Sequence, residues 1–207
     1  MGELRVPEAS DLDALHRLRT QYEVMLNTSQ GRIDENLEET RTWMQRFMPP
    51  NDLFTFNWCV WIRHEDHGWE HIGILGVHTL SPVPYLGYMI RKEWWVKGVV
   101  GNATRSFIDA YWSLDRRIVE ISLQEEDNDD DAGRVKSIEH AQGEQYTGAL
   151  ASEMLFAKTV VSNEASVRIL ASRGFKLVHL QHPTRSVHDE SETTIEVLTY
   201  VLKRSQQ

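Results

Sequence analysis

The segment from Glu125 to Asp131 limits what the rest of the chain can fold into, because six of its seven residues are acidic. Such a run repels itself and offers no apolar surface to bury, so we expect a mobile loop there. It lies within Asp115–Glu153, whose eleven acidic and four basic residues carry a charge of −7. Neither flank resembles a complete fold by itself. We therefore predict one domain over residues 1–207, interrupted by an acidic insertion at residues 115–153.

The overall charge excludes some classes of protein. The chain has 207 residues and a net charge of −9, most of which lies in the acidic segment. Binding to nucleic acid or to an anionic membrane surface needs a basic face, so we expect neither. The single cysteine, Cys59, excludes an internal disulfide or a cysteine metal cluster. No histidine spacing suits a metal ligand set, so we predict no metal site. Charges come too early in the N-terminal segment for a secretory leader, and no apolar run is long enough to cross a bilayer, so we expect a cytoplasmic protein.

The apolar periodicity predicts helices and strands on both sides of the acidic segment. Before it, Ser10 is a plausible N-cap for a first helix, and Pro49-Pro50 ends a second one. Strands are expected from the β-branched and aromatic runs. The elements predicted before the acidic segment are helices at about residues 10–22, 37–48 and 98–112, and strands at 54–63, 71–80 and 85–91.

After the acidic segment, Met154–Val161 fits either a strand or the end of a helix. A short helix begins at Asn163 and ends at Gly174, which suits the residue after a helix C-terminus. Two strands follow, Phe175–Leu180 and Thr193–Leu202. This order predicts a mixed α/β domain built around one sheet.

The most distinctive local feature is the glycine turn at residues 95–103, Trp-Val-Lys-Gly-Val-Val-Gly-Asn-Ala. It follows a predicted strand and opens a predicted helix. Such a turn lets successive backbone N–H groups point at one anion, and the helix dipole adds to the attraction. A pyrophosphate would suit the turn, although a plain helix start with two glycines is the alternative interpretation.

A second feature is the segment from Asn163 to Phe175. Asn163 is a natural N-cap. By itself the segment fits an ordinary amphipathic helix that stops at a glycine.

Taken in this order, the two features resemble the GNAT superfamily of acetyl-CoA-dependent N-acetyltransferases, in particular its ribosomal-protein-alanine acetyltransferase branch. The strand residues Gly87-Tyr88-Met89-Ile90 precede the glycine turn as in that branch, and Asn163, Ser166 and Gly174-Phe175 match its later motif. The resemblance covers residues 4–114 and 154–203. It implies a GNAT-type fold, with a central, mostly antiparallel twisted sheet flanked by helices.

The resemblance also implies roles for individual residues. Met89, Ile90 and Arg91 would pair with the pantetheine arm of acetyl-CoA, the co-substrate, and Asn163 would hydrogen-bond that arm. Ser166 would donate a proton or a hydrogen bond to the departing thiolate. The pyrophosphate would be held by the backbone of Lys97, Gly98, Val99, Val100, Gly101, Asn102 and Ala103.

Direct attack of a primary amine on the thioester needs no enzyme-bound acyl group, so we expect Cys59 to be a core residue. The amine must lose a proton, and His78 and Glu120 are the candidate bases. Each has a plainer interpretation, His78 as a satisfied strand histidine and Glu120 as a solvated acid. The acceptor would be a small-molecule amine or a protein N-terminus, bound near residues 27–34 and 181–192, on a monomer or homodimer.

The glycine turn departs from the family pattern. Val96 replaces a glycine, Val100 replaces a small residue, and Gly101-Asn102 replace Thr-Glu. A β-branched residue can crowd a phosphate that must approach the backbone closely. A catalytically silent acyl-CoA-binding or regulatory protein of the same fold is therefore the alternative. An interaction module that works through the acidic loop is a third hypothesis.

Overall fold

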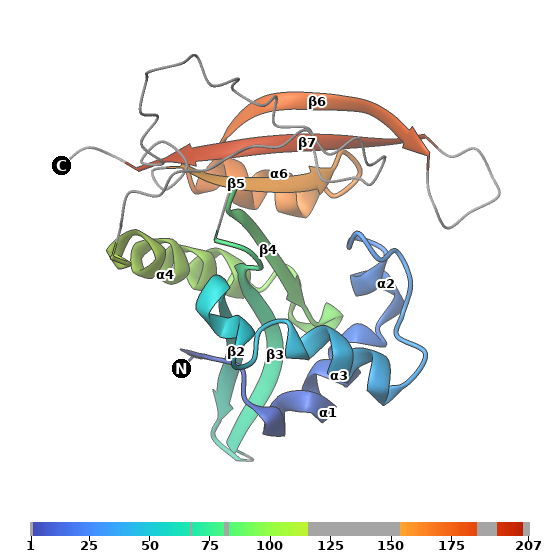
Figure 1. The fold of residues 1–207 in the computed structure, drawn as a ribbon, viewed down its shortest axis with the longest axis vertical. Coiled ribbons are helices and arrows are strands. Elements are labelled where there is room, and N and C mark those ends of the chain that lie inside the picture. Colours follow the sequence, from blue (N-terminus) through green and yellow to red (C-terminus); the bar gives the residue numbers. More distant parts are fainter. Residues whose placement is uncertain (1, 67, 81–82, 116–153, 186–193, 205–207) are drawn as a thin grey trace.

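The computed structural model describes residues 2–66, 68–80, 83–115, 154–185 and 194–204. Within them one seven-stranded sheet runs in the order β1-β2-β3-β4-β5-β7-β6 (Figure 1). Neighbouring strands are antiparallel except for β4 and β5, which are parallel. The strands are β1 (Gly2–Arg5), β2 (Phe56–His64), β3 (Gly68–Val77), β4 (Tyr85–Ile90), β5 (Met154–Val160), β6 (Lys176–Arg185) and β7 (Thr194–Lys203).

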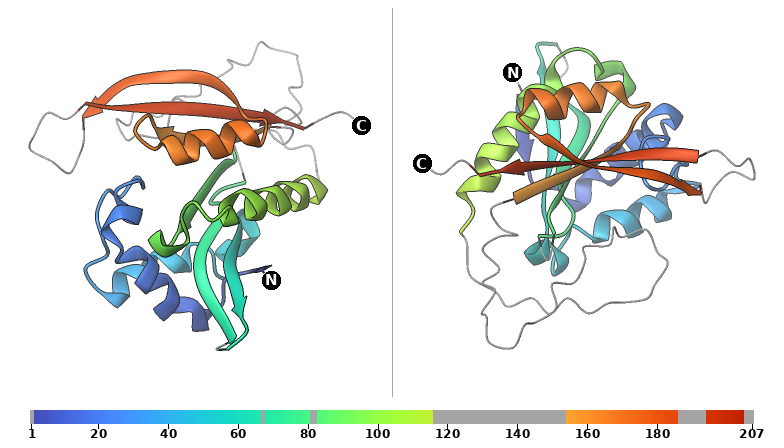
Figure 2. Two further views of the ribbon diagram at one scale, coloured as in Figure 1. Left: turned by 180° about the vertical axis from the view of Figure 1, so that it is seen from behind. Right: turned by 90° about the horizontal axis from the view of Figure 1, so that it is seen from above.

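Helices cover both faces of this sheet (Figure 2). On one face, α1 and α3 pack on residues such as Cys59 and Ile74, and on the other, α4 packs on residues such as Leu75. The helices are α1 (Leu12–Arg19), α2 (Tyr22–Met25), α3 (Leu37–Gln45), α4 (Val99–Ser113) and α6 (Glu164–Ser172), with short 3₁₀ turns η1 (Ala9–Asp11), η2 (Asn51–Phe54) and η3 (Lys92–Trp94). The predicted mixed α/β fold, a mostly antiparallel sheet flanked by helices, is confirmed.

The structure decides the open points of the sequence interpretation. Met154–Val160 is a strand, β5. The β1 strand was not predicted, because four residues carry too little alternation to signal a strand. Glu120 and nearly all of the predicted acidic insertion, residues 116–153, lie outside the described residues. None of the described helices combines the length and apolar character that a membrane span requires.

The first helix starts differently from the prediction. The N-terminal cap is formed by Glu8 and Asp11 rather than by Ser10. The Asp11 carboxylate accepts the Glu8 N–H at 2.8 Å and also binds the Arg5 guanidinium. Because this carboxylate satisfies both a backbone donor and a cation, the cap forms two residues earlier than the position of Ser10 suggested.

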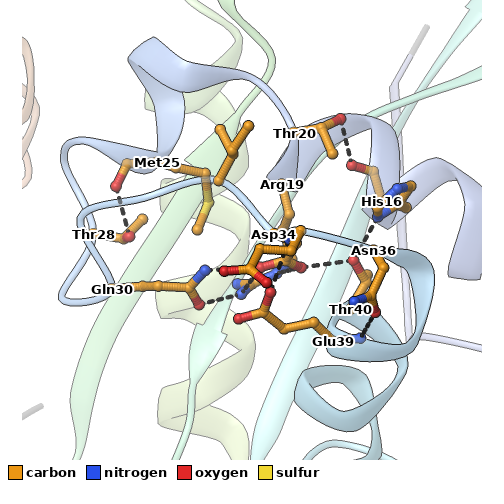
Figure 3. A network of polar contacts seen from close by, with 12 residues as sticks. His16, Arg19, Thr20, Met25, Thr28, Gln30, Asp34, Asn36, Glu39 and Thr40 are labelled. Carbon is orange, nitrogen blue, oxygen red and sulfur yellow. Dashed lines mark hydrogen bonds and ion pairs between the residues drawn. The ribbon is translucent and has the colours of Figure 1, made fainter.

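A buried ion pair joins α1 to the connection before α3 (Figure 3). Arg19 Nε and Nη2 donate to the two Asp34 oxygens at 2.6 and 2.7 Å, and both residues are 2% exposed. Thr40 on α3 and Gln30 also donate to this carboxylate. Burial alone would raise the pKa of Asp34, but these hydrogen bonds outweigh it and lower the pKa. The pair therefore fixes α1 and α3 against each other.

The Arg19–Asp34 pair also orients an aromatic row that reaches the sheet. The Arg19 guanidinium lies over the Trp43 ring, 4.2 Å from its centroid. Trp43 contacts Phe47 edge-on at 4.7 Å, and Phe47 stacks on the His78 ring at 5.0 Å. The position of His78 is thus linked through packed rings to the buried ion pair.

We predict that Asp34→Asn lowers the free energy of unfolding by about 3 kcal/mol, because it leaves the Arg19 charge buried without a counter-charge. Chemical denaturation followed by circular dichroism measures this change. Glu38→Gln, which breaks an exposed pair with Arg41 on α3, is the matched control and should cost under about 1 kcal/mol. Equal small losses in both variants would contradict the structural role of the pair.

Candidate functional site

The edge of β4 that faces β5 has no strand partner from Gly87 to Ile90. The two strands pair only at Tyr85↔Phe156 and Leu86↔Ala157, and they diverge beyond Leu86 (Figure 1). On its other side β4 stays paired with β3 as far as Ile90. Main-chain N–H and C=O groups need hydrogen-bond partners, so an unpaired strand edge can accept an extended ligand as an additional strand.

Alternation along β4 identifies the main-chain groups on that open edge. The Pro84 carbonyl accepts from Phe156 of β5, whereas the Arg91 N–H donates to Ile72 of β3. Because successive residues of a strand point their main-chain groups to opposite sides, those of Tyr88 and Ile90 face the gap beside β5. The Ile90 carbonyl accepts a hydrogen bond from the Trp95 indole at 2.7 Å. This leaves the Tyr88 N–H and C=O and the Ile90 N–H on the open edge.

The glycine turn leads from this edge into the N-terminus of α4. Gly98 is the N-cap, with a φ of 72°, and its carbonyl accepts the first intrahelical bond from Asn102. The N–H groups of Val99, Val100 and Gly101 precede that bond. The first turn has no acidic residue and no side-chain cap. This N-terminus therefore offers an anion both free donors and the positive end of a 15-residue helix.

The other residues of the turn lie in different surroundings. Ala103 is buried in the core beyond the first helical turn, and the Lys97 ammonium lies over the Trp94 ring at 4.7 Å. A Cβ on Gly101 would be 4.0 Å from Arg173 Nη2. The sequence interpretation did not single out Arg173, which follows α6 and brings a guanidinium beside the α4 N-terminus.

The backbone conformation of Val96 explains why a glycine would suit this position. Its φ is 53°, in the left-handed region, and its side chain is fully exposed. For a β-branched residue this conformation is strained by about 1–2 kcal/mol, and no packing contact offsets the strain.

Ser166 and Tyr88 meet across the gap between the parted strands. Asn163 caps α6, because its side-chain oxygen accepts the Ser166 N–H at 3.1 Å. Burial raises the pKa of the Tyr88 phenol, and the nearby Ser166 hydroxyl opposes this rise. The phenol oxygen is buried without a hydrogen bond of good geometry among the described residues. Two hydroxyls are thus brought together beside the open edge.

His78 lies on the opposite face of the sheet, next to α3. Burial of its ring, with smaller contributions from Arg46 and Arg19, lowers its pKa to about 4, although the residue as a whole is exposed. Its Nδ1 lies 3.0 Å from Asn57 Oδ1. The sequence interpretation overlooked Asn57, although two glycines in the adjacent strands, Gly76 and Gly87, signal a close approach at this level of the sheet.

Cys59 is fully buried in β2, which confirms that it is a core residue. Burial raises the pKa of its thiol far above the ordinary value, so the nucleophilic thiolate does not form at neutral pH. The described residues contain no group of three or more side chains that could hold a metal ion.

A family model described as "Acetyltransferase (GNAT) domain" matches residues 3–176. No curated protein sequence matches the chain. Solved structures share its fold at low sequence identity. One is an acetyltransferase from Salmonella typhimurium that modifies the N-terminal serine of a 50S ribosomal subunit protein, with a TM-score of 0.65, 15% identity and coverage of 99% of this chain and 95% of that one.

Two further structures are similar. Spermidine N-acetyltransferase from Vibrio cholerae, solved with CoA and spermine, gives a TM-score of 0.67 at 13% identity and covers 98% of this chain and 95% of that one. A GNAT-family acetyltransferase from Bacillus anthracis gives a TM-score of 0.63 at 14% identity, with 98% and 94% coverage.

This chain belongs to the GNAT acetyltransferase family, because the family model spans most of its length. It is an acetyltransferase that uses acetyl-CoA, as its two sequence motifs predicted.

We predict that Val96→Gly raises the free energy of unfolding by about 1 kcal/mol, because glycine adopts a positive φ without strain. Val96→Ala is the matched control, since alanine removes the branched side chain but keeps most of the backbone strain. Thermal unfolding compares the three proteins, and acetyl-CoA titration should show the tightest binding for Val96→Gly. A glycine variant no more stable than the alanine variant would contradict the strain.

Proposed function

We propose that the protein acetylates a primary amine, on a small molecule or a protein N-terminus, by direct attack of the amine on acetyl-CoA. The observation that carries the proposal is the alignment of the open β4 edge with the free N-terminus of α4. One offers main-chain partners to an extended amide chain, and the other offers donors to a pyrophosphate. The amide chain and the pyrophosphate are consecutive parts of CoA, and the amide chain carries the thioester at its other end.

The cofactor contacts follow from this arrangement. Tyr88 and Ile90 supply main-chain groups to the pantetheine arm, whereas the main-chain groups of Met89 and Arg91 face β3. The amide of Asn163 donates to the same arm. The N–H groups of Val99, Val100 and Gly101 at the α4 N-terminus bind the pyrophosphate, and Arg173 adds a positive charge beside it. Acetyl-CoA supplies the acetyl thioester to this site.

Ser166 and Tyr88 serve the departing sulfur. A thiolate leaves more readily when a hydroxyl donates a hydrogen bond or a proton to it. The Tyr88 phenol lacks a partner of good geometry, and its raised pKa keeps it protonated at neutral pH. It can therefore donate through Ser166 or directly.

Calorimetric titration with acetyl-CoA tests the proposal, and thiol release follows turnover. The amine panel contains a peptide with a free N-terminal serine, spermidine and a monoamine. We expect saturable binding and thiol release with at least one amine. No binding at millimolar acetyl-CoA would overturn the proposal, and binding without release from a wider amine panel would favour the catalytically silent alternative.

Variants separate the residue roles. Ser166→Ala and Tyr88→Phe should each lower kcat by roughly 10-fold or more while leaving acetyl-CoA affinity unchanged. Arg173→Ala should instead weaken acetyl-CoA binding. Arg168→Ala on α6, which removes an exposed arginine paired with Glu164, is the matched control and should change neither quantity.

A further inference from the structure

Three residues lie opposite one another on the neighbouring strands β2, β3 and β4. Asn57 pairs with Gly76, which pairs with Gly87. A Cβ on Gly76 would lie 2.2 Å from Asn57 Oδ1 and 2.6 Å from Asn57 Cα, so no side chain fits there. Glycine within a strand is less favourable than alanine, because it loses more conformational freedom on folding. Gly76 therefore leaves space on this face for a polar side chain, Asn57, which is 5% exposed.

The contacts of Asn57 fix the tautomer of His78. Asn57 Nδ2 donates to the Val77 carbonyl at 3.2 Å, which leaves Oδ1 facing His78 Nδ1 at 3.0 Å. An amide oxygen can only accept, so Nδ1 must carry the proton. The neutral ring then presents an unprotonated Nε2. The ionisable groups that act on this ring are Arg46 and Arg19, both cationic, and they favour the neutral form.

The free nitrogen of His78 faces the start of the parted strands. A Cβ on Gly87 would lie 3.4 Å from Nε2, so glycine leaves this nitrogen open. A cavity of about 20 Å³, lined by His78, Gly87, Tyr88, Met89, Ile74 and Leu75, adjoins it. That volume admits one water molecule. Gly87 is also the first β4 residue beyond the last pair with β5.

The two faces of β4 carry different chemistry at this point. Tyr88 packs with the core on the α4 face, whereas Met89 packs with the core on the α1 and α3 face. Strand alternation puts Gly87 and His78 on the second face as well. The His78 ring, whose Nε2 can accept a proton, thus lies on one side of the β4 edge. The Tyr88 and Ser166 hydroxyls lie on the other side.

We propose that His78, held by Asn57, accepts the proton of the attacking amine, directly or through one water in the adjoining cavity. This inference rests on the proposed function. The amine nitrogen forms a bond to the acetyl carbonyl carbon, and the C–S bond breaks with its electron pair on sulfur. The nitrogen proton passes to Nε2, and sulfur receives a proton from the hydroxyls on the other face. His78 then releases its proton to solvent, and solvent returns a proton to the Tyr88 or Ser166 hydroxyl that gave one up.

Nitrogen NMR of the histidine rings tests the positioning role of Asn57 without a substrate. At pH 7 we expect His78 of the full-length protein to be the Nδ1-protonated tautomer. In Asn57→Leu the tautomer should revert toward Nε2–H. An Nε2-protonated ring in the unmodified protein would overturn the inference. The tautomer of the unmodified protein tests the inference even if Asn57→Leu fails to fold.

Kinetics with the amine that the unmodified protein acetylates fastest test the proton transfer. His78→Gln should lower kcat about 100-fold with unchanged acetyl-CoA affinity. In Asn57→Asp the carboxylate should raise the pKa of His78, so that activity is lost at a higher pH as the ring becomes protonated. His179→Gln, on the exposed β6, is the control and should match the unmodified protein.

The failures of the two proposals are distinguishable. A protein that binds no acetyl-CoA refutes the proposed function, whatever the tautomer of His78. Normal acetyl-CoA binding and turnover in His78→Gln, with an unshifted pH profile in Asn57→Asp, refutes the role of His78 alone.

Discussion

The separation of β4 from β5 is the constraint on which the site depends. Two parallel strands that pair at only two positions leave main-chain donors and acceptors of β4 without a strand partner. The rest of the fold holds this gap open. On one side β3 pairs with β4 from Leu86 to Ile90, and on the other β7 pairs with β5 along seven residues. A sheet interrupted in its middle thus exposes an edge that is normally found only at the border of a sheet.

Each half of the sheet brings its own groups to the gap. The first half supplies the β4 edge, the α4 N-terminus and the His78 ring, which is linked through Phe47 and Trp43 to the buried Arg19–Asp34 pair. The second half supplies Ser166 from one short helix, α6, and Asn163 and Arg173 from the residues that flank it. The site is therefore a junction of two parts that lie on either side of the acidic segment in the sequence. This explains why neither flank resembles a complete fold by itself.

Much of this architecture could be predicted from the sequence, because its signals are local. Apolar spacing marked α1, α3 and α4, and β-branched runs marked β2 to β4. The glycine turn and the Asn163 cap marked the two helix N-termini. The missing parts depend on contacts between distant residues. The two glycines opposite Asn57 acquire their meaning only through strand register, and the approach of Ser166 to Tyr88 depends on how α6 sits beside β4. Val96 was recognised as a departure from the family pattern, but its positive φ required the structure.

Amide hydrogen exchange at the β4 edge, followed by NMR with and without saturating acetyl-CoA, tests the central claim most directly. The Tyr88 and Ile90 amides should exchange rapidly in the free protein and become protected when acetyl-CoA binds. The Met89 amide, which faces β3, should be protected in both states. Unchanged exchange at Tyr88 and Ile90 in the saturated protein would contradict the assignment of this edge as the acetyl-CoA site.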